Sequence, residues 1–99
     1  MPVKIDPTTL AEHVGSEFTV LDDPSKEFRI TLTSIVEHVK TESLETFSLF
    51  FHGPSTLMMQ QGIRNLKHEH LGELSMFLVP IGQDAEGFQY EAVFNHLIR

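Results

Sequence analysis

The sequence contains no cysteine among its 99 residues. Without thiols there can be no disulfide, no cysteine nucleophile, no thiolate zinc site and no iron–sulfur cluster. The absence is typical of a reducing compartment, and we expect a cytoplasmic protein.

Long apolar runs and basic residues are also scarce. No stretch approaches the ~20 apolar residues that a membrane-spanning helix needs, and the start, MPVKIDP, lacks the apolar core of a signal peptide. Seven Lys and Arg residues stand against 14 Asp and Glu residues, which gives a formal net charge of -7. Such a charge repels phosphate backbones and anionic lipids. We therefore predict a soluble protein that binds neither nucleic acid nor membranes.

Local catalytic motifs are missing as well. The chain has no Gly-x-Ser-x-Gly elbow, no His-Glu-x-x-His pattern and no Gly-rich phosphate loop. Asp22 and Asp23 precede Pro24, where acidic residues are ordinary turn formers. These absences favour a protein that is not an enzyme and that needs no cofactor.

The chain does contain apolar and polar residues that alternate with a period of two, the pattern of half-buried strands. The clearest case is 27–43, where β-branched residues dominate and the alternation changes phase near Ser34. A bulge or a strong bend in one long strand explains such a change. Further strands are expected at 17–22, at 44–55, from Thr56 to Gln61 with a weak continuation through Ile63 and Leu66, at 71–82 and at 88–98.

Turn and cap residues complete the predicted fold. Asp6, Pro7 and Gly15 favour one short helix from Pro7 to His13. Pro80 and Gly82 are expected to stop the fifth strand, and the next few residues to form a hairpin loop into the sixth. Residues 1–99 are therefore predicted to form a single, mainly β domain: a compact antiparallel barrel or sandwich of about six strands with one short N-terminal helix.

Six histidines are many for a chain of this length. His68 and His70 are two residues apart, so on a strand both rings would lie on one face and could chelate a metal. His52 and His96, at expected strand ends, could join them. The alternative is that these histidines only complete turns. A small metal-dependent or acid/base hydrolase centred on His68 and His70 is therefore the second functional hypothesis.

Several apolar side chains are candidates for a contact surface. Met58 and Met59 could form an adaptable surface or fill the core. Phe50 and Tyr90 are the aromatic residues most worth testing for exposure, because a tyrosine hydroxyl needs water or a partner. The aromatic residues of the strands, these two included, are nevertheless expected to lie mainly in the core; they are Phe47, Phe50, Phe51, Phe77, Phe88, Tyr90 and Phe94.

The segments FSLFFHGP, MQQGIRNLKHEHLGELSMFLVPIG and YEAVFN resemble a family of small bacterial proteins of unknown function. The pattern comprises Phe-x-Leu-x-Phe-x-Gly-Pro, Gln-Gly, His-x-x-Leu-Gly, Phe-Leu-x-Pro and Tyr-x-Ala-x-Phe-Asn. The sequence departs from it at Ile63, where an aromatic residue is common in the family. The matching positions are Phe47, Leu49, Phe51, Gly53, Pro54, Gln61, Gly62, His68, Leu71, Gly72, Phe77, Leu78, Pro80, Tyr90, Ala92, Phe94 and Asn95.

The resemblance implies a small, mostly β domain with no established activity, encoded near proteins similar to phage tail collars. An accessory or assembly role would follow from that context. It also implies that His68 is a buried anchor that bonds backbone groups across a tight turn, and that Asn95 has a similar part at a strand end. The other positions expected to be structural are Gly53, Pro54, Gly62, Gly72 and Pro80.

Our leading hypothesis is a non-enzymatic β domain that binds a protein partner, or a second copy of itself, through a strand edge. An exposed edge can add a further strand through main-chain hydrogen bonds.

Overall fold

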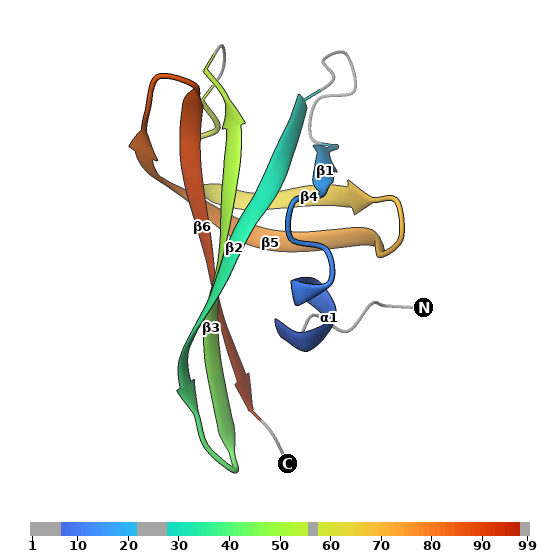
Figure 1. Cartoon of the computed structure of the whole chain (residues 1–99), viewed down its shortest axis with the longest axis vertical. Helices are drawn as coiled ribbons and strands as arrows, with labels where there is room; N and C mark the ends of the chain where they lie inside the picture. The colour runs from blue at the N-terminus through green and yellow to red at the C-terminus, as the bar shows by residue number, and fades with distance from the viewer. Residues whose placement is uncertain (1–6, 22–27, 56–57, 98–99) are drawn as a thin grey trace.

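The computed structural model describes residues 7–21, 28–55 and 58–97. In chain order these residues form one helix and six strands (Figure 1): α1 Pro7–Ala11, β1 Glu17–Val20, β2 Phe28–Lys40, β3 Leu44–Pro54, β4 Gly62–His68, β5 Gly72–Gln83 and β6 Gly87–Leu97. All strand pairs are antiparallel. The predicted mainly β fold with one short N-terminal helix is confirmed.

The strands form a closed barrel in the order β1-β2-β3-β6-β5-β4. The closure is short, because the register of β1 and β4 contains only the pairs Thr19↔Lys67 and Val20↔Leu66. In Figure 1, β4 and β5 run across the long strands β3 and β6. Of the two predicted architectures, the barrel is the observed one.

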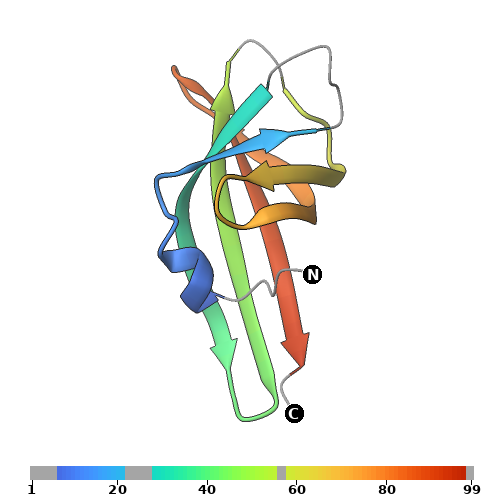
Figure 2. The ribbon, with the colours of Figure 1, turned by 90° about the vertical axis from the view of Figure 1, so that its right-hand side faces the viewer.

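Three strands continue beyond the barrel as a smaller sheet (Figure 2). Strand β1 pairs with β2 only over 28–31, and β5 pairs with β6 only over 88–91. The remainder of β2 and β6 has β3 between them and no further strand outside among the described residues. We call this part the sheet extension; it comprises residues 34–50 and 91–97.

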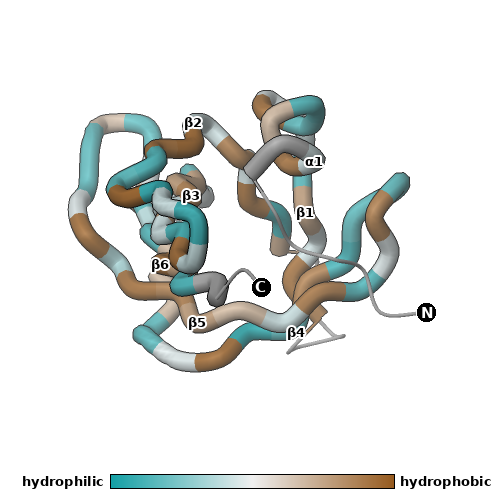
Figure 3. Tube along the Cα trace, turned by 90° about the horizontal axis from the view of Figure 1, so that it is seen from below, coloured by the Kyte–Doolittle hydropathy of each residue, from teal (hydrophilic) through white to brown (hydrophobic). Residues whose placement is uncertain are grey.

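The core follows from the alternation of side chains along the strands, which Figure 3 shows as changes between hydrophobic and hydrophilic residues. The largest fully buried side chains come from all six strands and from α1: Tyr90, Phe18, Phe47, Phe51, Leu10, Ile30, Leu32, Leu49, Leu66 and Leu78. Phe77 is an exception to the aromatic core, because it lies on the outer face between the buried Met76 and Leu78 and is 50% exposed.

The bulge expected near Ser34 is present, as a register shift between Leu32 and Ser34 in the β2–β3 ladder. A second shift separates Glu37 from Val39. Both shifts lie in the strand where the apolar alternation changes phase, so the sequence pattern reflects the real bend.

Three predicted boundaries were wrong. The helix ends at Ala11 rather than His13. Residues 58–61 are not a strand, since the Met59 amide donates to the Tyr90 hydroxyl (2.9 Å), and β4 begins only at Gly62. Strand β5 does not stop at Pro80. This residue lies opposite Tyr90, whose backbone groups point towards β3, so the Pro80 nitrogen faces away from β6, on the side where the β4–β5 ladder has already ended at Gly62↔Leu78.

Two further expectations concern a turn and membrane-spanning helices. The turn expected at 22–25 lies outside the described residues. Within the described ranges, no helix has the length and apolarity needed to cross a membrane.

Candidate functional site

His68 lies at the end of β4 and organises the turn into β5. Its side chain is buried, with 2% of the residue exposed. The ring Nδ1 accepts hydrogen bonds from the backbone N–H groups of His70 (3.0 Å) and Leu71 (3.2 Å). The turn ends at Gly72, whose φ of 79° favours glycine. These bonds are of the kind that the family resemblance implies for a turn anchor.

The same bonds fix the protonation of the neutral His68 ring. Because Nδ1 accepts two N–H donors, the proton must be on Nε2. Nε2 therefore donates to the Ser16 hydroxyl (2.8 Å), which donates in turn to the His13 carbonyl oxygen (2.5 Å). This chain of hydrogen bonds ties the end of β4 to the turn that follows α1.

That tautomer is the wrong one for nucleophilic catalysis. A general base must take the hydroxyl proton of a serine with a free lone pair. Nε2 of His68 carries a proton, and Ser16 already donates to a backbone carbonyl group. Ser16 and His68 thus form a structural link rather than a nucleophile and its base.

His13 joins His68 and His70, and sequence reasoning missed it. The ring of His13 lies 4.7 Å from that of His68 and 5.9 Å from that of His70, measured between centroids. The rings of His68 and His70 are 5.8 Å apart. No local signal marked His13, because only the packing of the α1 turn on the β4–β5 turn brings it there.

The three rings do not form a metal centre in this arrangement. Both nitrogens of His68 are hydrogen-bonded to protein groups. Across the described ranges, no group of three or more His, Asp or Glu side chains is placed to hold a metal ion. His52 lies elsewhere, bound to Asp84, and His96 is described only by its backbone, which pairs with Glu45.

The surroundings of His68 disfavour its charged form. Burial lowers its pKa below the ordinary value of 6.5, and the neighbouring His13 and His70 lower it further, while Glu69 opposes the shift. A protonated Nδ1 would also face two backbone donors instead of accepting from them. Protonation of His68 at acidic pH should therefore destabilise the turn between β4 and β5.

We predict that the free energy of unfolding falls as the pH drops from about 6.5 towards the lowered pKa of His68. A depressed folded-state pKa gives stability that is complete above the unfolded-state value and is lost in acid. Urea unfolding at a series of pH values would measure the loss. His13→Gln, which removes one neighbour that lowers the pKa of His68, should reduce this loss of stability, whereas unchanged stability in the wild type down to about pH 5 would contradict the assignment.

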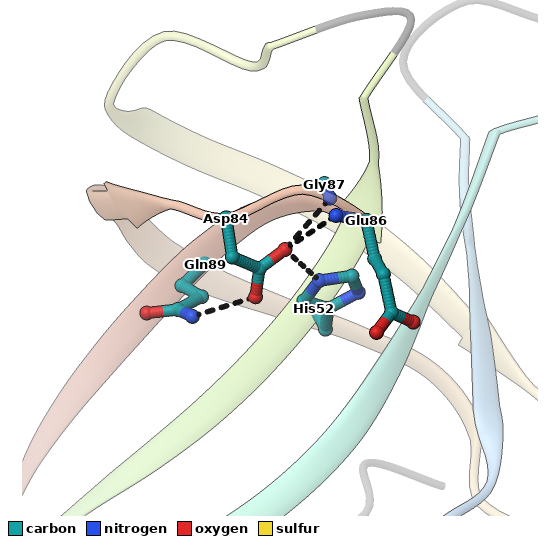
Figure 4. A network of polar contacts seen from close by, with 5 residues as sticks. All are labelled: His52, Asp84, Glu86, Gly87 and Gln89. Atoms are coloured by element: carbon teal, nitrogen blue, oxygen red, sulfur yellow. Dashed lines mark hydrogen bonds and ion pairs between the residues drawn. The ribbon is translucent and has the colours of Figure 1, made fainter.

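A second polar network organises the β5–β6 turn (Figure 4). Asp84 Oδ1 accepts from the amides of Glu86 and Gly87 (2.9 Å each) and from His52 Nε2 (3.2 Å), and Oδ2 accepts from Gln89 Nε2 (3.0 Å). These bonds, that from His52 first, lower the pKa of the Asp84 carboxyl group to about 2. In the described part of the chain no hydroxyl group is hydrogen-bonded to His52, so we interpret the network as a turn clamp.

The outer face of the sheet extension contains a third histidine contact. His38 Nε2 lies 2.7 Å from the hydroxyl group of Ser48. A nucleophile must be reachable by substrate, but Ser48 is completely buried. Around this pair the face is apolar, with Val36, Val39 and Val93 each exposed by about half.

The two outer edges of the sheet extension differ. The β2 edge carries Glu37 and Lys40, is interrupted by register shifts, and has α1 packed against the same strand. Charges and bulges are the usual means by which proteins protect an edge. Strand β6, in contrast, keeps one unbroken register with β3 from Leu44↔Leu97 to Pro54↔Gly87.

The β6 edge, residues 92–97, is uncharged, with the sequence AVFNHL. The Gly87 carbonyl oxygen accepts from the Asp84 amide on the β5 side (2.8 Å). Backbone groups alternate in direction along an antiparallel strand. The N–H and C=O groups of Val93 and Asn95 therefore point away from β3, where β6 has no partner strand among the described residues.

The residues predicted for a contact surface are not brought together. Tyr90 and Met59 are buried, and the Met59 amide donates to the Tyr90 hydroxyl group, so of the two readings left open for Met59 the core is the observed one, and neither side chain can join an exposed surface. Met58 is 47% exposed, but it lies in the β3–β4 connection, away from the sheet extension. Phe50 is half-buried on the outer face, opposite Ser34 and Glu91.

The predicted structural residues occupy varied places. Gly53 is buried in β3, where an added Cβ would lie 3.1 Å from both Ile30 Cγ2 and Tyr90 Cε2. Pro54 ends β3, and Gly62 begins β4. Asn95 is not a turn anchor: it lies within β6, and its exposed Oδ1 accepts from the Thr46 hydroxyl across the ladder (3.1 Å).

Comparison with known proteins gives a family but no activity. The model of a domain of unknown function, DUF6916, matches residues 5–94. No curated protein and no solved structure matches the chain.

Proposed function

The chain belongs to the DUF6916 family, and from its structure we propose that it is a non-enzymatic module that binds an extended segment of another protein as an added strand on β6. The proposal includes an accessory or assembly role. That role is implied by the family resemblance, because members of the family are encoded near proteins similar to phage tail collars.

One observation carries the proposal: the β6 edge is regular, uncharged and unpaired among the described residues. An edge of this kind presents a row of unused backbone donors and acceptors and is a template for a further strand. Six residues suffice for a strand of ordinary length. Recognition by strand addition obtains its affinity from such main-chain bonds.

The histidine contacts support the non-enzymatic half of the proposal. His68 is committed to a turn, His52 to Asp84, and His38 to a buried serine. Each contact satisfies a polar group of the fold, and none of them presents an activated nucleophile to a substrate.

Proline at position 93 tests the strand-addition mechanism. Because the Val93 N–H points away from β3, Val93→Pro should remove an edge donor and leave the β3–β6 ladder intact. Val93→Thr is the matched variant, since it keeps the N–H and a β-branched side chain. The probes are capped octapeptides with four repeats of Lys-Val, Thr-Val or Glu-Val, titrated into the ¹⁵N-labelled full chain.

We expect at least one octapeptide to shift the amide signals of residues 93 and 95 in the wild type and in Val93→Thr, and binding to Val93→Pro is read from Asn95, because proline has no amide proton. Binding should be at least about tenfold weaker to Val93→Pro, because one main-chain bond is lost and the ring hinders the approach of a strand. Equal binding to the two variants, or no shift at these amides with any peptide, would refute strand addition at β6.

A further inference from the structure

We infer that the segment bound at β6 is basic, with apolar and cationic residues in alternation. This inference rests on the proposed function, and it concerns the chemistry of the partner rather than the mode of binding.

The charge of the sheet extension points to a cationic partner. Glu91 is partly exposed on β6 at the point where the open edge begins. Elsewhere in the extension Glu37, on the opposite edge, and Glu42 are exposed, and Lys40 is the extension's one lysine or arginine. The whole chain has a formal net charge of -7. Opposite charges increase the rate of encounter and disfavour wrong partners.

The two faces of β6 explain the alternation. On the inner face, Ala92 is buried and the half-buried Phe94 stacks on Phe47 with centroids 5.2 Å apart. On the outer face, Val93 lies between Glu91 and Asn95. An added strand would place every second side chain beside Phe94 and the others on the side of Glu91. Apolar residues suit the first set, and lysine or arginine suits the second.

The same charges argue against a second copy of the chain as the occupant. A second copy would bring to the edge another molecule with a formal net charge of -7. Two molecules of like net charge repel each other as they approach. The partner is therefore a different protein with a basic extended segment.

The test compares the Lys-Val, Thr-Val and Glu-Val octapeptides on the wild-type chain by ¹⁵N chemical-shift titration. At low salt we expect the Lys-Val peptide to bind on the order of tenfold more tightly than Thr-Val, and Glu-Val to bind most weakly. The differences in affinity between the three peptides should become smaller at high salt, because exposed charges are screened. A Lys-Pro octapeptide has the same charge but cannot form a strand, and it should not shift Val93 or Asn95.

Two variants locate the charge effect. Glu91→Gln should reduce the preference for Lys-Val over Thr-Val by at least about threefold. Glu73→Gln, an exposed position on β5 outside the sheet extension, should leave the preference unchanged.

The outcomes separate the two proposals. Equal binding of the three Val-containing peptides at Val93 and Asn95 would overturn the basic partner while strand addition stands. A preference for Glu-Val would do the same. Binding of a second copy of the chain at the same edge instead would be shown by two results together. In the absence of peptide, the signals of these amides would change with protein concentration, and sedimentation would detect a dimer. That outcome would overturn the proposal of a basic partner. Absence of binding by every peptide would remove both proposals together.

Discussion

Gly87→Ala should destabilise the protein by about 3 kcal/mol or more, because the new methyl group would overlap the backbone of the neighbouring strand. A Cβ at this position would lie well inside van der Waals contact of the Gly53 carbonyl oxygen, and 3.0 Å from Cε1 of His52. Gly87 pairs with Pro54 at the end of the β3–β6 ladder. Strands β3 and β6 would have to separate there, since a backbone oxygen in a ladder cannot move aside alone.

Gly82→Ala is the matched control in the same hairpin. Its Cβ would first meet the Oε1 atom of Gln89 at 3.2 Å, which is the end of a flexible side chain. We expect a change below about 1 kcal/mol. Urea unfolding of the two variants and the wild type measures both effects. Equal losses of stability in the two variants would show that Gly87 does not lie in tight contact with the backbone of Gly53.

Replacing His68 by alanine should destabilise the fold by about 3 to 5 kcal/mol. The substitution leaves the amides of His70 and Leu71 without their acceptor, and it breaks the link to Ser16. It also removes a buried ring that packs on Phe18, with centroids 4.6 Å apart. Unsatisfied buried donors and a cavity both lower stability.

Two further variants distinguish a turn anchor from a merely buried ring. His68→Asn can restore an acceptor near the two amides, because asparagine oxygens accept from backbone groups two and three residues on. It should recover part of the stability that His68→Ala loses. His70→Ala removes an exposed ring and should change stability by less than about 0.5 kcal/mol. A His68→Asn variant no more stable than His68→Ala would contradict the anchor role.

The sequence predicted those features of the fold that depend on neighbouring residues. The alternation in β2 and its change of phase near Ser34 reflect a real strand and a real bulge. The continuation of β5 past Pro80 was not predicted, since it depends on the Pro80 nitrogen facing the side on which β4 has already ended. The partner of the buried Tyr90 hydroxyl group could not be foreseen either, because it is a backbone amide in the β3–β4 connection.

The candidate sites divide in the same way. The spacing of His68 and His70 suggested a chelating pair, and the resemblance suggested an anchor. Only the structure shows that Nδ1 of His68 faces two backbone amides. His13 approaches from a distant turn. The open edge of β6 arises because β5 leaves it after Glu91, and no pattern within β6 itself reports where its neighbour ends.

The most direct measurement of the central claim is amide hydrogen exchange along β6, with and without the Lys-Val octapeptide. In the free protein, Val93 and Asn95 should exchange rapidly, whereas Ala92 and Phe94, whose amides point towards β3, should be protected. Saturating peptide should slow exchange at Val93 and Asn95 by at least about tenfold. Protection of these two amides in the free protein, or unchanged rates with bound peptide, would contradict an open edge that accepts a strand.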